Sequence, residues 1–157
     1  GQLPLLSVFG GKITTYRELA ERGLPQIAPF FPQMSGDWTA DMPLPGGDMA
    51  NADFESFEAS FRARHPFLPR ALARHYARLY GTRAEVLIGG ASSLVDLGRH
   101  FGGLLYAREI DYLVATEWAE TAEDILECRT KHGLALTDAE RRTVGDYLDQ
   151  RQSLAAQ

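Results

Sequence analysis

Apolar residues recur at helical spacing through most of the chain after residue 50. Phe54, Phe57 and Phe61 are three and four residues apart, and they predict a helix that ends before His65-Pro66. Two further segments repeat this spacing, with apolar positions at Leu72, Tyr76, Leu79 and Tyr80, and then at Tyr106, Ile110, Leu113, Val114 and Trp118. The pattern therefore predicts about five or six helices and no extended sheet over residues 50–157.

Capping residues mark where several of these helices begin and end. Gly81 is a natural stop for the helix that follows Pro69. Thr121 is expected to cap a helix that runs through Cys128 or Arg129, and Thr137-Asp138-Ala139-Glu140 has the form of a capping box that opens the final helix. The segment Glu85-Val86-Leu87-Ile88 is too short to assign.

The first fifty residues follow a different pattern. The short apolar run from Leu3 to Phe9, ended by Gly10-Gly11, predicts a buried strand that closes on a tight turn. A helix is expected from Ile13 to about Ala28, weakened in its second half by Gly23 and Pro25. Prolines and glycines then punctuate residues 29–51, which we expect to be mostly loop.

Composition narrows the class of protein. With 45% hydrophobic and 24% charged residues the chain is ordinary globular protein, and no apolar run approaches the ~20 residues of a membrane-spanning helix. Cys128 is the single cysteine, so an internal disulfide and a cysteine-cluster zinc site are excluded. The four histidines form no His-x-x-x-His pair, and we expect no metal site from their spacing. The start lacks Met and a basic leader, so we expect an excised piece of a longer protein.

Arginines gather in residues 62–83, which contain no acid. They are Arg62, Arg64, Arg70, Arg74, Arg78 and Arg83. One interpretation is a surface for an anion, a nucleotide or a lipid headgroup. The other interpretation is a solvent-exposed helix face that contacts the acidic C-terminal half of the chain. It is favoured because Arg70, Arg74 and Arg78 fall on one exposed helical stripe.

The segment from Leu5 to Arg17 has the clearest potential for chemistry. A strand that passes through Gly10 and Gly11 into a helix start presents free backbone N–H groups and the positive end of the helix dipole. Lys12 adds a full positive charge, which favours an anionic or electron-rich ligand. The segment is not a phosphate-binding P-loop, because Ile13 follows the lysine and Leu6 stands where the first glycine of that motif belongs. On spacing alone, a purely structural turn is about as well supported as a ligand site.

A family resemblance gives this turn a more definite role. The segment Phe9-Gly10-Gly11-Lys12-Ile13-Thr14-Thr15-Tyr16-Arg17 resembles the one that returns to the flavin in the aerobic, FAD-dependent glycerol-3-phosphate dehydrogenases. Further similar segments follow in order along essentially the whole chain: Trp38-Thr39, Leu44-Pro45-Gly46-Gly47, Arg64-His65-Pro66-Phe67-Leu68, Ala73-Arg74-His75-Tyr76-Ala77-Arg78-Leu79-Tyr80-Gly81, Asp96-Leu97-Gly98, Phe101-Gly102, Tyr106, Glu109, Tyr112-Leu113-Val114, Glu117-Trp118, Asp124 and Arg129-Thr130-Lys131. The family tends to carry two adjacent arginines where this chain has Cys128-Arg129.

The resemblance implies a mainly α fold in which a helical C-terminal cap domain, residues 51–157, follows a remnant of the FAD-binding region in residues 1–30 and a connecting loop in 31–50. It implies that a remnant strand, turn and helix approach the cofactor through Gly10, Gly11, Lys12, Ile13 and Thr14, with Lys12 acting electrostatically on the flavin or the substrate phosphate. The catalytic base is not identifiable in this chain.

The resemblance also implies an activity and partners. Such a parent enzyme oxidises sn-glycerol 3-phosphate to dihydroxyacetone phosphate, with FAD as hydride acceptor and a quinone as electron acceptor. The parent is expected in the cytoplasm, peripherally on the inner membrane, with no nucleic acid and with a homo-oligomer as one form. This chain alone is expected to be inactive, without bound FAD, and to need the remainder of its FAD domain. The rival interpretation is a stand-alone helical interaction or regulatory module with the arginines as its partner surface.

Overall fold

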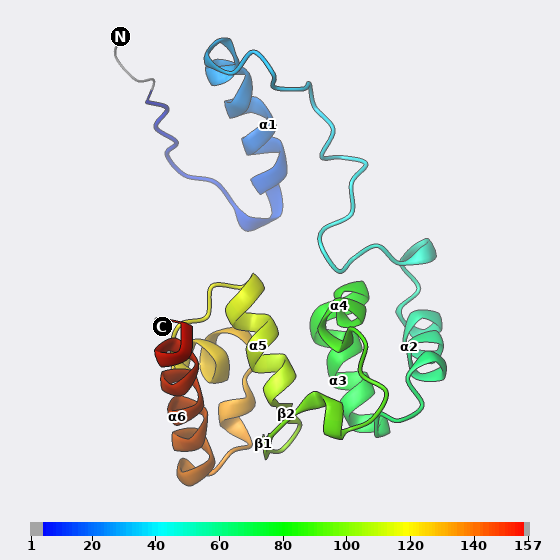
Figure 1. Ribbon diagram of the computed structural model, residues 1–157. Helices are drawn as coiled ribbons and strands as arrows, with labels where there is room; N and C mark the ends of the chain where they lie inside the picture. Colours follow the sequence, from blue (N-terminus) through cyan, green and yellow to red (C-terminus); the bar gives the residue numbers. More distant parts are fainter. Residues whose placement is uncertain (1–4, 156–157) are drawn as a thin grey trace. The chain divides into compact units, whose positions relative to one another are not determined.

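The computed structural model describes residues 5–155, and the chain divides into two compact units, residues 1–44 and 45–157 (Figure 1). The first unit holds helix α1. The second holds helices α2 to α6 and a short hairpin of strands β1 and β2. The described chain is therefore mainly helical, as the sequence pattern predicts.

The first unit is built around one helix. A 3-10 turn at Ile13–Thr15 leads into α1 (Tyr16–Ile27), which runs through Pro25 into a second 3-10 turn at Ala28–Phe30. This confirms the helix expected from Ile13 to Ala28, and neither Gly23 nor Pro25 ends it. Pro25 has no backbone N–H, so α1 lacks only the one bond that residue 25 would donate to the Glu21 carbonyl.

The strand expected over Leu3 to Phe9 is not present in the part that the structure describes. Residues 5–12 have no regular secondary structure, and Leu3 lies outside the described residues. A strand is stabilised by hydrogen bonds to a neighbouring strand, and within the described residues this segment has no such neighbour. Leu5 and Phe9 are consequently 90% and 93% exposed.

The second unit begins with three helices. A 3-10 turn at Ala50–Ala52 precedes α2 (Phe54–Arg64), whose first turn is capped by Asp53 through a 3.1 Å bond from the Ser56 backbone N–H. Helix α3 (Arg70–Tyr80) stops at Gly81, as predicted. A 3-10 turn at Gly81–Arg83 then leads into α4 (Ala84–Ile88), the short apolar segment that the sequence leaves unassigned.

The second half of this unit departs from the helical pattern in two places. After a 3-10 turn at Val95–Leu97, strands β1 (His100–Gly102) and β2 (Leu105–Tyr106) form an irregular antiparallel hairpin, which the sequence pattern does not predict. The segment Asp124–Arg129 is a π-helix. The remaining elements are α5 (Ala107–Thr116), a 3-10 turn at His132–Leu134, and α6 (Asp138–Ala155).

Both predicted caps in this half are confirmed. The Thr121 hydroxyl accepts a 3.1 Å bond from the Asp124 N–H, and the Asp124 carboxylate accepts a 3.0 Å bond from the Thr121 N–H. At the start of α6 the Thr137 hydroxyl accepts a 3.3 Å bond from the Glu140 N–H, and the Glu140 carboxylate accepts a 2.8 Å bond from the Thr137 N–H. Each pair satisfies backbone donors that a helix start leaves free.

One apolar core holds the second unit together. Helix α2 packs on α3, α4 on α5, and α6 on β1. The most deeply buried large side chains of this core include Phe61, Leu72, Tyr76, Leu87, Ile88, Leu97, Leu105, Ile110, Leu113, Ile125 and Val144. Most of the predicted aromatic and aliphatic positions thus serve as packing. The exceptions include Leu79, which is exposed, and Trp118, which lies beyond the end of α5 and is also exposed. None of the described helices is long and apolar enough to cross a membrane.

The end of α3 is joined closely to the start of the second unit. The Thr82 N–H donates a 3.0 Å bond to the Gly46 carbonyl, and Gly81 has a φ of +55°, in the left-handed region that favours glycine. A Cβ atom on Gly81 would collide with the backbone of Gly46, and one on Gly46 would collide with the backbone of Tyr80. Two backbone segments therefore meet here with no room for a side chain.

Candidate functional site

The glycine turn of the first unit has the backbone geometry that a close approach of a ligand requires. Gly10 and Gly11 have φ values of +83° and +118°, which residues with a Cβ atom rarely adopt. A Cβ atom on Gly11 would lie 3.0 Å from the Leu19 Cδ2 atom of α1, whereas one on Gly10 would meet nothing within 4 Å. A glycine at position 11 thus lets the turn pack against α1. The space beside the Cα atom of Gly10 is free of other protein atoms.

The three residues after the glycines begin the helix and remain open to solvent. The Lys12 carbonyl accepts bonds from the Thr15 N–H at 3.0 Å and the Thr15 hydroxyl at 3.2 Å, which fixes the first turn. The side chains of Lys12, Ile13 and Thr14 are exposed, with Ile13 88% exposed. The turn therefore gathers a positive side chain and a helix start at one open surface.

A hydrogen bond ties the rest of this unit to α1. The Thr39 hydroxyl donates to the Glu21 carboxylate at 2.5 Å, and Arg17 pairs with Glu21 at 2.8 Å one helical turn away. The bond from Thr39 is the main reason that the pKa of Glu21 lies below its ordinary value. The loop at Trp38-Thr39 is held against the helix by this contact.

The second unit contains a buried polar cluster that sequence spacing does not reveal. Glu109 of α5 is fully buried, and its two carboxylate oxygens face His75 Nε2 of α3 at 2.8 Å and His132 Nε2 at 3.2 Å. The Tyr80 hydroxyl donates a further bond to Glu109 at 2.6 Å. Burial raises the pKa of the Glu109 carboxyl, but the hydrogen bonds from His132 and His75 outweigh burial and hold that pKa below its ordinary value.

Two imidazoles and a carboxylate are also a set of metal-ligand types. The candidate ligand atoms of His75, Glu109 and His132 all lie within 4.8 Å of one another. The expectation of no metal site rested on spacing along the chain. Such spacing cannot detect a cluster whose residues come from three separate segments. Hydrogen bonds between these residues already satisfy both carboxylate oxygens, so the network accounts for the buried charge through the protein's own groups.

A tyrosine beside this cluster lacks a partner. Among the residues that the structure describes, the Tyr76 hydroxyl is the buried side-chain polar atom without a hydrogen bond. Burial, followed by the negative charge of Glu109, raises the pKa of Tyr76, which keeps its hydroxyl neutral. The cluster thus combines a satisfied carboxylate with one costly unsatisfied hydroxyl.

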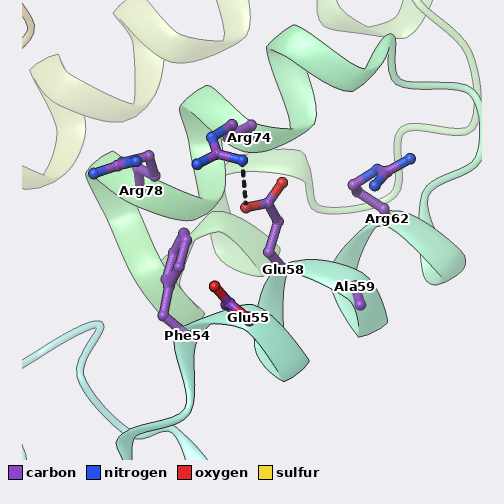
Figure 2. A pocket seen from close by; sticks show the side chains of 7 residues that line it. All are labelled: Phe54, Glu55, Glu58, Ala59, Arg62, Arg74 and Arg78. Atoms are coloured by element: carbon purple, nitrogen blue, oxygen red, sulfur yellow. Dashed lines mark ion pairs between the residues drawn. The ribbon is translucent and has the colours of Figure 1, made fainter.

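Three of the six arginines, Arg62, Arg74 and Arg78, line a groove between α2 and α3. Figure 2 shows Arg74 reaching across to Glu58, with Arg62 and Arg78 at opposite ends of the groove. The Arg74–Glu58 ion pair is 3.5 Å long, and the Arg78 guanidinium lies 5.9 Å from the centre of the Phe54 ring.

Two of the three arginines outside the groove, Arg64 and Arg83, are held by other contacts. Arg64 pairs with Glu85 at 2.6 Å, and Arg83 donates a 2.7 Å bond to the Tyr112 hydroxyl. The acids that pair with Arg64 and Arg74 lie in α4 and α2 rather than in the acidic C-terminal half. Of the six arginines, Arg64 and Arg74 are thus paired with acids, and the described residues include no ion pair of Arg62, Arg70, Arg78 or Arg83.

The comparison with known proteins places the chain in one family. The model of the C-terminal domain of alpha-glycerophosphate oxidase matches residues 38–152. The chain is 58% identical to D-erythritol 1-phosphate dehydrogenase of Brucella abortus over 95% of its length. It is 50% identical to glycerol-3-phosphate dehydrogenase of Pseudomonas aeruginosa over 94%, and 45% identical to aerobic glycerol-3-phosphate dehydrogenase of Escherichia coli over 99%.

These relatives are much longer proteins. The matched region spans 30%, 29% and 32% of their respective lengths. The match nevertheless covers both units, including the glycine turn and the buried cluster. It confirms the family resemblance that the motifs predict.

Proposed function

The chain belongs to the family of the C-terminal domain of alpha-glycerophosphate oxidase, with glycerol-3-phosphate dehydrogenases among its relatives, and we propose that it serves a flavoprotein that oxidises sn-glycerol 3-phosphate to dihydroxyacetone phosphate. The observation that carries the proposal is the open Gly10-Gly11-Lys12 turn within a chain of this family.

The turn fits a flavin by its chemistry. Bound FAD supplies the hydride acceptor in this reaction. Gly10 presents backbone without a side chain, and the helix start after Lys12 provides positive potential. In the proposed site Gly10, Gly11, Lys12, Ile13 and Thr14 contact the cofactor, and Lys12 holds a positive charge near the flavin or the substrate phosphate.

The role of Lys12 is electrostatic. Hydride transfer places negative charge on the acceptor, and a fixed cation stabilises that charge more in the transition state than in the ground state. The base that takes the hydroxyl proton is proposed to lie in the part of the enzyme that this chain does not include. The chain alone is accordingly proposed to be inactive and to lack bound FAD.

Lys12→Ala in the full-length enzyme tests this role. Loss of one preorganised charge commonly removes on the order of 2.7–4 kcal/mol of transition-state stabilisation, so turnover should fall by about 10²-fold or more. Lys12→Arg should restore part of the turnover. Arg22→Ala, an exposed change on α1 after the turn, should leave turnover unaltered. Turnover, substrate affinity and flavin content of Lys12→Ala within about twofold of the parent would exclude the role.

A second substrate has a specific observation in its favour. The relative that is 58% identical is named for D-erythritol 1-phosphate, which is also a phosphorylated polyol. Steady-state kinetics of the full-length enzyme with both compounds decide between them. A higher kcat/KM for glycerol 3-phosphate supports the first proposal, and a higher value for D-erythritol 1-phosphate replaces it with the second.

The wider setting is part of the same proposal. The full-length enzyme passes electrons to a quinone and lies in the cytoplasm at the inner face of the inner membrane, without nucleic acid. The remainder of its FAD domain is the direct partner of this chain, and a homo-oligomer is one expected form. Flavin absorbance in the full-length protein, together with its absence from residues 1–157 alone, tests the cofactor and the division of roles.

A further inference from the structure

Trp118 has an unfavourable backbone conformation and an exposed side chain. It directly follows Glu117, the C-cap of α5, and its φ is +52°. This position after a helix is most often glycine, because a Cβ atom makes the left-handed region unfavourable. Its side chain is 87% exposed, so burial of the indole does not compensate for the strain.

A single arginine fixes the backbone on both sides of this residue. Arg129 donates to the Glu117 carbonyl at 3.0 Å and to the Trp118 carbonyl at 3.1 Å, while its third nitrogen pairs with Asp124 at 2.9 Å. Asp124 in turn accepts bonds from the backbone N–H groups of Glu120 and Thr121 at 3.1 and 3.0 Å. The turn is therefore held rigidly in the strained conformation.

Glycine would end the helix at less cost, so the end of α5 does not explain the indole. Strained residues that the surrounding structure holds in place are commonly part of a binding or switching site. Tryptophan is also the side chain most enriched among the energetically dominant residues of interfaces. The combination indicates a side chain presented for contact.

The surroundings of Trp118 define what it can contact. The next residue, Ala119, borders a groove of about 460 Å³ between α5 and α6, lined also by Val114, Leu148, Arg151, Gln152 and Leu154. Exposed acids flank the turn in the sequence at Glu117, Glu120 and Glu123. The one cation in the groove lining, Arg151, is paired with Asp111 at 3.0 Å. A mostly apolar groove near exposed carboxylates suits a protein surface with apolar and basic side chains, and it disfavours an anionic lipid surface.

We propose that Trp118 is the anchor through which this helical domain docks onto the part of the full-length enzyme that lies outside residues 1–157. This inference rests on the proposed function, because it takes the longer protein as the setting. Most of the length of the relatives lies outside the matched region. One indole beside a small groove falls short of the ~1,000 Å² that a stable interface between separate proteins buries. Within one polypeptide the effective concentration is high, so a small anchored contact suffices.

Hydroxyl-radical footprinting of the full-length protein and of residues 1–157 tests the contact directly. Oxidation of Trp118 should be several-fold slower in the full-length protein. Leu134, which is 84% exposed, is the internal control and should react similarly in both. Equal oxidation of Trp118 in the two proteins would overturn the proposal. So would protection that appears only with added vesicles of phosphatidylserine, or only at high protein concentration, since these indicate a lipid surface or a second copy.

The substitution Trp118→Gly supplies a second test, because its expected effect on Tm differs between the two proteins. It relieves the backbone strain, so the Tm of residues 1–157 should stay the same or rise, whereas the Tm of the full-length protein should fall. Leu134→Ala is the control, and it should change the Tm of the two proteins by similar amounts. A Tm that moves in the same direction in both would contradict docking. Turnover on glycerol 3-phosphate is measured separately, so a protein with protected Trp118 and no such turnover refutes the proposed function and leaves the docking contact standing.

Discussion

At the scale of single residues, the buried Glu109 is the most consequential side chain of the second unit. A carboxylate without solvent is tolerated only when its oxygens receive hydrogen bonds, and here His75, His132 and Tyr80 donate them. These donors are themselves buried or half-buried. Removing the charge therefore leaves several polar groups without their acceptor.

Glu109→Gln should lower the free energy of unfolding by about 3 kcal/mol, because breaking a buried ionic network leaves uncompensated polar groups. Urea denaturation followed by circular dichroism measures the change. Glu123→Gln, an exposed substitution of the same kind, serves as the control and should cost less than about 0.5 kcal/mol. Equal stability of the two variants would mean that the network contributes little.

The same residue predicts a dependence of stability on pH. The pKa of Glu109 is lowered in the folded protein from its ordinary value of 4.5, so the unfolded chain binds its proton more readily. The stabilisation is complete above about pH 4.5 and is lost as pH falls below that value. Urea midpoints measured at decreasing pH should fall more steeply for the parent than for Glu109→Gln. Parallel curves would show that Glu109 does not contribute to the acid sensitivity.

At the scale of elements, the sequence predicts what neighbouring residues determine. The Phe54, Phe57 and Phe61 spacing, the two capping pairs and the stop at Gly81 all depend on residues within about one or two turns, and each is present. The hairpin of β1 and β2 is missed because strands of three and two residues are too short to show alternation. The partners of Glu109 are missed because they lie 34 and 23 residues away along the chain.

The predicted glycine turn is present but its strand is not. Positive φ values at Gly10 and Gly11 follow from local chemistry, whereas a strand over residues 5–9 requires a neighbour that local sequence does not supply. Whether the turn contacts flavin depends on groups outside the described chain, which is why Lys12 remains a prediction for kinetics to test.

Thr121→Ala should destabilise the second unit by about 1 kcal/mol. The substitution removes the hydroxyl that accepts from Asp124 N–H at the start of the segment before the π-helix. Ser153→Ala is the control, since its hydroxyl bonds only to the Asp149 carbonyl within α6. Differential scanning calorimetry compares the two, and a loss for Thr121→Ala no larger than for the control would mean that the cap is dispensable.

At the scale of the whole molecule, the two units differ in how they are stabilised. The apolar core lies entirely within the second unit, whereas α1 has no buried residue and its unit exposes many large apolar side chains. These include Leu5, Phe9, Ile13, Tyr16, Phe30, Phe31, Trp38 and Met42. A unit with so little buried surface is expected to unfold locally at low cost.

Limited proteolysis should therefore cut within residues 5–44 well before it cuts the second unit. Mass spectrometry of the resistant fragment should identify a product that begins near Pro45. The product should keep the Tm of the parent chain, because the core is unchanged. A fragment that loses cooperative unfolding would show that residues 1–44 contribute to the stability of the second unit.

The meeting of Gly46 and Gly81 also constrains how the family can diverge. Each position excludes a side chain because of the backbone opposite it, so a substitution at one cannot be rescued by any substitution at the other. Contacting positions usually change together through compensating mutations, but no such mutation exists for this pair. Lineages that retain the contact are therefore expected to inherit both glycines unchanged, and to lose both freely once an insertion separates the two segments.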